Sequence, residues 1–312
     1  MEFLYQLEAL RMPVLNEIML AITTLGEETA FLAIALIFFW CVDKKRGYLL
    51  MSVGFAGTMV NQFLKLWFRI PRPWVLDPEF TILESAREAA SGYSFPSGHT
   101  TMAVGTFGSI AVSSKKWGIR ILNILIALLV GFSRMYVGVH TPADVLVGAL
   151  TSVVLILLLR PITMGNSEKG MKFLLAALIA MAVGLLAFVE WYPFPTDVDA
   201  HNLESGVKNA YTMLGSLIGV AIVYVVDVKH LDFTTYAKWW AQILKVVLGM
   251  ILVIGVKEGL RTPLEMLFQD PMIARGVRYF LIVIVAGIVW PMTFGWFSRL
   301  GRKVTKHELR YH

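Results

Sequence analysis

The sequence predicts an all-α fold, a polytopic membrane helical bundle of about nine transmembrane helices. Hydrophobic residues make up 57% of the chain and charged residues only 16%. The mean hydropathy of +0.66 is outside the range of soluble globular domains. Apolar runs recur along the whole chain, each of roughly the twenty residues that a bilayer-crossing helix needs. We therefore expect no separate soluble domain.

The apolar runs place the individual helices. We expect a helix at each of the nine segments 28–42, 47–68, 99–113, 118–135, 142–159, 171–189, 208–226, 241–256 and 277–297. Residues 13–25 are expected to form an interfacial or re-entrant helix before the first span. The single cysteine, Cys41, lies in an apolar run, so the sequence offers neither a disulfide nor a thiolate metal site.

Charges in the connecting segments predict the orientation. Basic residues follow the first, third, fifth and last spans: Lys44, Lys45, Arg46, Lys115, Lys116, Arg120, Arg160, Lys169, Lys172, Arg299, Arg302, Lys303, Lys306 and Arg310. Lys and Arg are retained on the cytoplasmic side, so the amino terminus is expected outside and the carboxy terminus inside. We expect a multi-pass protein of a bacterial cell membrane. The net charge of +6 then reflects insertion, and no nucleic-acid partner is expected.

One connection on the outer side is basic, although Lys and Arg are usually retained on the cytoplasmic side. Lys65, Arg69, Arg72 and Arg87 all lie between the second and third spans. The same outer face holds the start of the third span, FPSGHT, and the connection SRMYVGVHTPAD between the fourth and fifth spans. Ionisable residues at membrane spans are costly and are more often functional than incidental. The three segments are therefore predicted to form one site.

The basic residues of these segments predict an anion site, and phosphate fits best. The guanidinium groups of Arg72 and Arg134 match phosphate oxygens in pairs, and Lys65 adds a point charge. Ser97 and the backbone amides after it open a helix, where unpaired N–H groups and the helix dipole favour negative charge. Gly98 lets the backbone approach a ligand closely.

Two histidines and a carboxylate predict a second, catalytic role. Asp144 is placed to accept a proton from one nitrogen of His140, which directs the other nitrogen outward as a nucleophile. His99 is placed to protonate the departing oxygen as a general acid. Taken singly, the residues also fit structural roles: Lys65 as an interface lysine, Ser97 as a helix cap and Asp144 as a first-turn carboxylate.

Together these residues resemble the type 2 phosphatidic acid phosphatase (PAP2) superfamily of membrane lipid phosphate phosphatases. Its signature has three parts, found here as Lys65 with Arg72-Pro73, Pro96-Ser97-Gly98-His99, and Ser133-Arg134 with His140 and Asp144. The resemblance covers roughly residues 26–159. It implies a core of six helices, here within a catalytic domain of residues 1–190. Residues 191–312 would then add extra spans and a basic cytoplasmic tail.

The resemblance also implies an activity without a metal or other cofactor. In the family, the histidine that corresponds to His140 attacks phosphorus, and the aspartate that corresponds to Asp144 orients this histidine. The histidine that corresponds to His99 protonates the leaving alcohol. Lys65, Arg72, Ser97, Gly98 and Arg134 match phosphate-binding residues. The expected substrate is a lipid phosphate at the outer membrane face.

Several alternatives to this lipid phosphatase remain open. One is a phosphatase of a small soluble substrate, as for glucose-6-phosphatase, and another is a polyprenyl diphosphate phosphatase. The expected nine spans exceed the six-helix core, and this longer arrangement is similar to the glucose-6-phosphatase and sphingosine-phosphate phosphatase branches. A lipid transporter or scramblase that binds phosphate head groups without hydrolysing them is the non-enzymatic alternative.

Overall fold

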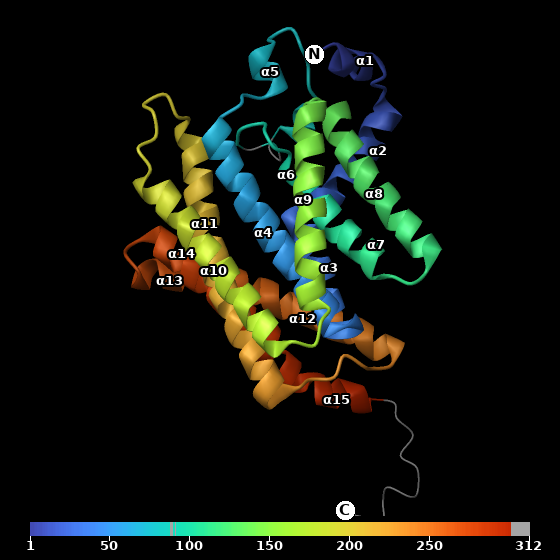
Figure 1. The fold of residues 1–312 in the computed structure, drawn as a ribbon, viewed down its shortest axis with the longest axis vertical. Helices are drawn as coiled ribbons and strands as arrows, with labels where there is room; N and C mark the ends of the chain where they lie inside the picture. Colours follow the sequence, from blue (N-terminus) through green and yellow to red (C-terminus); the bar gives the residue numbers. More distant parts are fainter. Residues whose placement is uncertain (88–89, 91, 301–312) are drawn as a thin grey trace, which may run out of the picture.

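The computed structural model describes residues 1–87, 90 and 92–300, and within these residues all regular structure is helical (Figure 1). The α-helices are α1 (Glu2–Ala9), α2 (Pro13–Thr23), α3 (Glu28–Ile37), α4 (Lys44–Phe68), α5 (Pro73–Leu76), α6 (Gly98–Ala103), α7 (Ser109–Ser113), α8 (Trp117–Tyr136), α9 (Pro142–Thr163), α10 (Glu168–Trp191), α11 (Ala200–Val226), α12 (Trp239–Gly259), α13 (Arg261–Leu267), α14 (Pro271–Ile284) and α15 (Phe294–Arg299). Turns of π-helix at Phe38–Val42, Val104–Gly108, Asp227–Leu231 and Val285–Val289, and 3-10 turns at Thr24–Gly26, Glu84–Ala86 and Pro291–Thr293, extend or join them.

The predicted all-helical membrane bundle is confirmed, while the number of nine spans stays a prediction. Within the described residues, 7 helices are long and apolar enough to cross a membrane, or up to 8 if the pair Pro13–Gly26 and Glu28–Val42, bent by 56°, is one span. The helical stretch through α6 and α7 is about 24 Å long at 1.5 Å per residue. That length is shorter than the hydrocarbon core of roughly 30 Å.

Most helices begin and end within a few residues of the predicted bounds, and α11 is the main exception. It begins at Ala200, well before the predicted residue 208. The side chain of Asp199 accepts a hydrogen bond of 2.8 Å from the Asn202 amide, which starts the helix in a polar stretch. The last predicted helix is broken by the turn at Pro291. The short helices α1, α5 and α13 were not predicted.

Helix α4 is the centre of the bundle. Its buried residues extend from Gly47 to Leu66, and α9, α10 and α11 pack against it. Figure 1 shows α1 near one end of the molecule, close to the start of α9, and α15 near the opposite end. Arg299 ends α15. The other basic residues predicted for the tail, Arg302, Lys303, Lys306 and Arg310, lie outside the described residues.

The carboxy-terminal helices join the bundle through close backbone contacts. Helix α11 packs against α10 on one side and α14 on the other. A Cβ added at Gly215 of α11 would lie 2.0 Å from the carbonyl oxygen of Gly276 in α14. No side chain fits between two backbones at that distance, so glycine is required at Gly215.

Gly215→Ala is expected to lower the thermal unfolding midpoint in detergent, because overpacking a helix contact costs about 1–3 kcal/mol. Gly255→Ala is the matched control, since a Cβ at Gly255 of α12 meets no atom within 4 Å. The control should raise the midpoint or leave it unchanged, because alanine favours helix over glycine. Equal midpoints for the two variants would contradict the close α11–α14 contact.

Candidate active site

The end of α4 brings two cations to the same loop. Arg69 has φ 50° and ψ 37°, so a left-handed residue ends the helix and turns the chain. Lys65, in the last turn of α4, donates through Nζ to the carbonyl oxygen of Tyr93. Arg72, just before α5, donates through Nε to the carbonyl oxygen of Gly92 at 3.0 Å. The two side chains thus hold the backbone that precedes Ser94.

Ser97 starts α6 and ties it to α9. Its Oγ accepts hydrogen bonds from the amide and from the hydroxyl of Thr100, at 3.4 and 2.9 Å. The Ser97 amide donates to the backbone carbonyl of Asp144 at 3.0 Å. The capping role expected of Ser97 is therefore real, and it places the first turn of α6, with Gly98 and His99, beside the first turn of α9.

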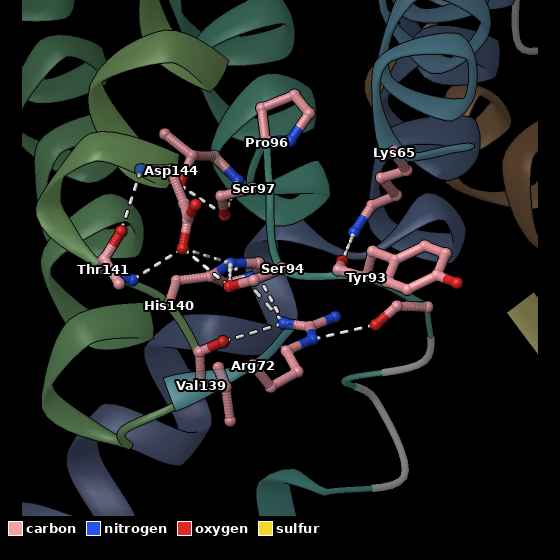
Figure 2. Close-up of polar contacts among 12 residues, drawn as sticks. Lys65, Arg72, Tyr93, Ser94, Pro96, Ser97, Val139, His140, Thr141 and Asp144 are labelled. Atoms are coloured by element: carbon pink, nitrogen blue, oxygen red, sulfur yellow. Dashed lines mark hydrogen bonds and ion pairs between the residues drawn. The ribbon is translucent and has the colours of Figure 1, made fainter. Parts of the chain in front are cut away.

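The Asp144 carboxylate is the central acceptor of the site (Figure 2). Its Oδ2 accepts 2.7 Å hydrogen bonds from the backbone amide of Thr141 and from the hydroxyl of Ser94. The Thr141 hydroxyl accepts the Asp144 amide in return, which completes a capping box at the start of α9. Nδ1 of His140 lies 3.5 Å from the same Oδ2. The carboxylate is buried, so these donors fix its position.

The neighbours of the His140 ring determine which nitrogen carries the proton. Nη1 of Arg72 lies 2.9 Å from Nε2 and 3.5 Å from Nδ1 of His140 and also donates to the Val139 carbonyl at 2.8 Å. The Asp144 carboxylate, which only accepts, faces Nδ1, so the proton belongs on Nδ1 and the lone pair on Nε2. This is the tautomer that a nucleophilic Nε2 requires.

His140 is held neutral as well as oriented. Burial, and then the positive charges of Arg72, Arg134 and Lys65, place the pKa of His140 well below its usual range. Burial is the largest of these causes, because the His140 side chain is only 1% exposed. A neutral ring keeps the Nε2 lone pair free for attack.

Unpaired donors lie beside this ring. Arg134 is fully buried and donates through Nη1 to the Thr23 hydroxyl at 2.7 Å, while its Nε and Nη2 have no partner in the described part of the chain. Nε2 of His99 is buried and also lacks a partner there. Buried donors without acceptors cost free energy. An anion with several oxygens would supply the acceptors.

A cavity of about 490 Å³ opens beside these residues. Its walls include Lys65, Gly98 and His99, together with Asn202 of α11, but not Arg72, Arg134 or His140. Arg72 covers Nε2 of His140, so a reaction at Nε2 needs Arg72 to turn from the ring to the ligand. Among residues 1–87, 90 and 92–300, no three His, Cys, Asp or Glu side chains form a group that could hold a metal.

The structure thus brings the predicted residues to one place. Arg72, His140 and Asp144 form direct contacts, Ser97 contacts Asp144, and Lys65, Gly98 and His99 share the cavity. Arg134 adjoins them through its carbonyl, which accepts the Val139 amide at 3.1 Å.

Sequence reasoning missed two polar residues of this site. Ser94 donates to Asp144, and its Oγ lies 3.5 Å from Nδ1 of His140. Asn61, one turn before Lys65 on α4, donates to the Pro96 carbonyl at 3.2 Å. Ser94 stands three residues before Ser97, just ahead of the segment FPSGHT, but hydroxyl residues are common in loops, and only the fold shows its partner.

Comparison with known proteins agrees with this arrangement. The PAP2 superfamily pattern matches residues 45–168, and a second pattern, the transmembrane extension of PAP2 superfamily phosphatases, matches residues 211–303. Phosphatidylglycerophosphatase B of Bacillus subtilis (strain 168) is 33% identical over 177 residues, which cover 53% of this chain and 81% of that protein. The chain belongs to the PAP2 superfamily.

Other relatives in the PAP2 superfamily have different named substrates. An undecaprenyl-diphosphatase of Bacillus subtilis (strain 168) is 33% identical over 145 residues, 46% of this chain and 72% of that protein. Sphingosine-1-phosphate phosphatase 1 of Mus musculus is 26% identical over 255 residues, 76% of this chain and 57% of that protein. No solved structure gives a significant match.

Nitrogen NMR of ¹⁵N-histidine-labelled protein tests the state of His140. We expect its ring to be neutral at about pH 6, with the proton on Nδ1, because burial and three cations lower its pKa below the usual value of about 6.5. His140→Asn assigns the signal by its loss. A cationic ring at about pH 6, or a neutral ring protonated on Nε2, would contradict the geometry.

Proposed function

We propose that the chain hydrolyses the phosphate monoester or diphosphate of a membrane lipid through a phosphohistidine formed on His140. The observation that carries the proposal is the placement of the His140 ring, with Nδ1 toward Asp144 and Nε2 toward Arg72. This placement supports a nucleophilic Nε2 beside a group that binds phosphate.

In the first step, Nε2 of His140 attacks phosphorus and the bond between phosphorus and the lipid oxygen breaks. His99 gives a proton to that oxygen, so the lipid leaves as an alcohol. Asp144 accepts the Nδ1 proton of His140 in a hydrogen bond and stabilises the positive charge that forms on the ring. In the second step, His99 takes a proton from water, and that water attacks phosphorus. Phosphate leaves and His140 is restored.

The cations hold the transferred phosphoryl group. Lys65, Arg72 and Arg134 stabilise charge on its equatorial oxygens, with the unpaired Nε and Nη2 of Arg134 as the best-supported donors. Ser97 and Gly98 contribute the start of α6. Arg72 moves from Nε2 of His140 to the phosphoryl oxygens, which frees the nucleophile as substrate binds.

The proposed substrate is a lipid phosphate reached from the outer face of the membrane. The named substrates of the relatives, a phosphatidylglycerophosphate, undecaprenyl diphosphate and sphingosine-1-phosphate, support a phosphorylated lipid without choosing between monoester and diphosphate. We place the amino terminus outside, with nine crossings when the bent first pair and the short stretch through α6 and α7 each count as one. We also propose residues 1–190 as the catalytic domain and residues 191–312 as additional spans.

Phosphate release from a panel of substrates tests this function. Lysophosphatidate, undecaprenyl diphosphate and glucose 6-phosphate are assayed side by side in detergent, with His140→Ala as the blank. We expect turnover of at least one lipid substrate and a loss of about 10³-fold or more in His140→Ala, because the nucleophile is removed. EDTA should leave the rate unchanged, since the proposed donors are all protein groups.

The proposal would be contradicted if the wild-type protein released no phosphate from any lipid substrate. Turnover of glucose 6-phosphate alone would assign a soluble substrate. Hydrolysis that persists in His140→Ala would remove the histidine from the mechanism, and loss of activity in EDTA with recovery on adding a divalent ion would also contradict it.

A further inference from the structure

A second cavity lies deeper in the bundle and is apolar. It has a volume of about 270 Å³ and is lined from one side by α3 and α4 and from the other by α11, α12 and α14. Most of its lining side chains are aliphatic or aromatic, among them Leu32, Leu36, Phe55, Val220 and Val253. This lining suits a hydrocarbon and offers a phosphate few partners.

The apolar cavity continues the polar one beside the active site. Glu28 and Thr29, in the first turn of α3, line both cavities. On α4 the polar cavity is lined by Thr58, Gln62 and Lys65, and the apolar cavity by residues one to two turns earlier. The two cavities therefore adjoin at the first turn of α3, and the lining on α4 changes from polar at the site to apolar farther from it.

Helix α11 shows the same change along a single face. Its residues Asn202, Ser205 and Asn209 line the polar cavity. Met213, Val220 and Val223, farther along, line the apolar one. These positions recur at spacings of three, four or seven residues, so they lie on one side of the helix. We call the apolar cavity, lined by α3, α4, α11, α12 and α14, the chain slot.

The dimensions of the chain slot fit one hydrocarbon chain. From Glu28 to Phe39 its wall on α3 and the following π turn extends about 16 Å at 1.5 Å per residue. Half of a hydrocarbon core is about 15 Å thick, which is the depth reached by one lipid chain. The volume is just below the roughly 300–1,000 Å³ of ordinary ligand pockets, so a single chain fits better than two.

We propose that the chain slot binds the single hydrocarbon chain of the lipid phosphate while its head group occupies the polar cavity. The inference rests on the proposed function and adds that the substrate is a single-chain lipid phosphate. It also gives the carboxy-terminal helices a role, because α11, α12 and α14 supply one wall of the slot.

A series of n-alkyl monophosphates from butyl to dodecyl, each below the concentration at which it forms micelles, tests the slot. For the wild-type protein, kcat/KM should rise by roughly fourfold for each added methylene until the slot is full, because each buried methylene leaves water. No dependence on chain length would overturn the proposal.

Two substitutions fill the slot from opposite walls. Leu36→Trp acts from α3 and Val253→Trp from α12, and each should lower the ratio of dodecyl to butyl kcat/KM by at least tenfold. The matched controls are Ile37→Trp and Ile251→Trp, next to or near these residues on the same helices but 37% and 62% exposed. The controls should keep the wild-type ratio within twofold. An unchanged ratio in the slot variants, or an equal fall in the controls, would contradict the proposal.

Photolabelling tests the slot without substitutions and without catalysis. A dodecyl phosphonate with a diazirine on its terminal carbon should label slot residues of α3, α11 or α12, identified by mass spectrometry, and dodecyl phosphate should compete. Labelling confined to the lipid-facing surface would overturn the slot. Slot labelling in a protein that releases no phosphate from any substrate would instead retain the binding site and reject the proposed phosphatase.

Discussion

The carboxylate of Asp144 holds the site together. Its Oδ2 accepts from the Thr141 amide at the start of α9 and from the Ser94 hydroxyl in the loop before α6, and it faces Nδ1 of His140. The backbone carbonyl of the same residue accepts the Ser97 amide. One residue therefore fixes the first turns of two helices and the tautomer of His140. Its loss would leave His140 without a defined orientation.

The cations around Asp144 give the site an excess of positive charge. Lys65, Arg72 and Arg134 are all buried, and burying like charges together costs several kcal/mol for each ion unless partners compensate. Backbone carbonyls of Tyr93, Gly92 and Val139 compensate in part. A bound anion with several oxygens would supply the missing partners.

Much of the site could be predicted from the sequence because its chemistry depends on few residue types at fixed spacing. Asp144 was expected in the first turn of a helix, and the local capping box that it forms with Thr141 places it there. Ser94 and Asn61 were missed because their partners are distant in the sequence. The number of spans was harder to predict, since a short buried helix such as α6 with α7 needs no full membrane length. The chain slot depends on five helices packing together, which no local pattern specifies.

Trapping the covalent intermediate tests the central claim most directly. The protein is mixed with a ³²P-labelled lipid phosphate that it turns over, quenched in alkali within the first turnover, and digested for mass spectrometry. An acid-labile, base-stable phosphoryl group is expected on His140. Steady turnover with no label, or a label on Ser94 or His99, would contradict it.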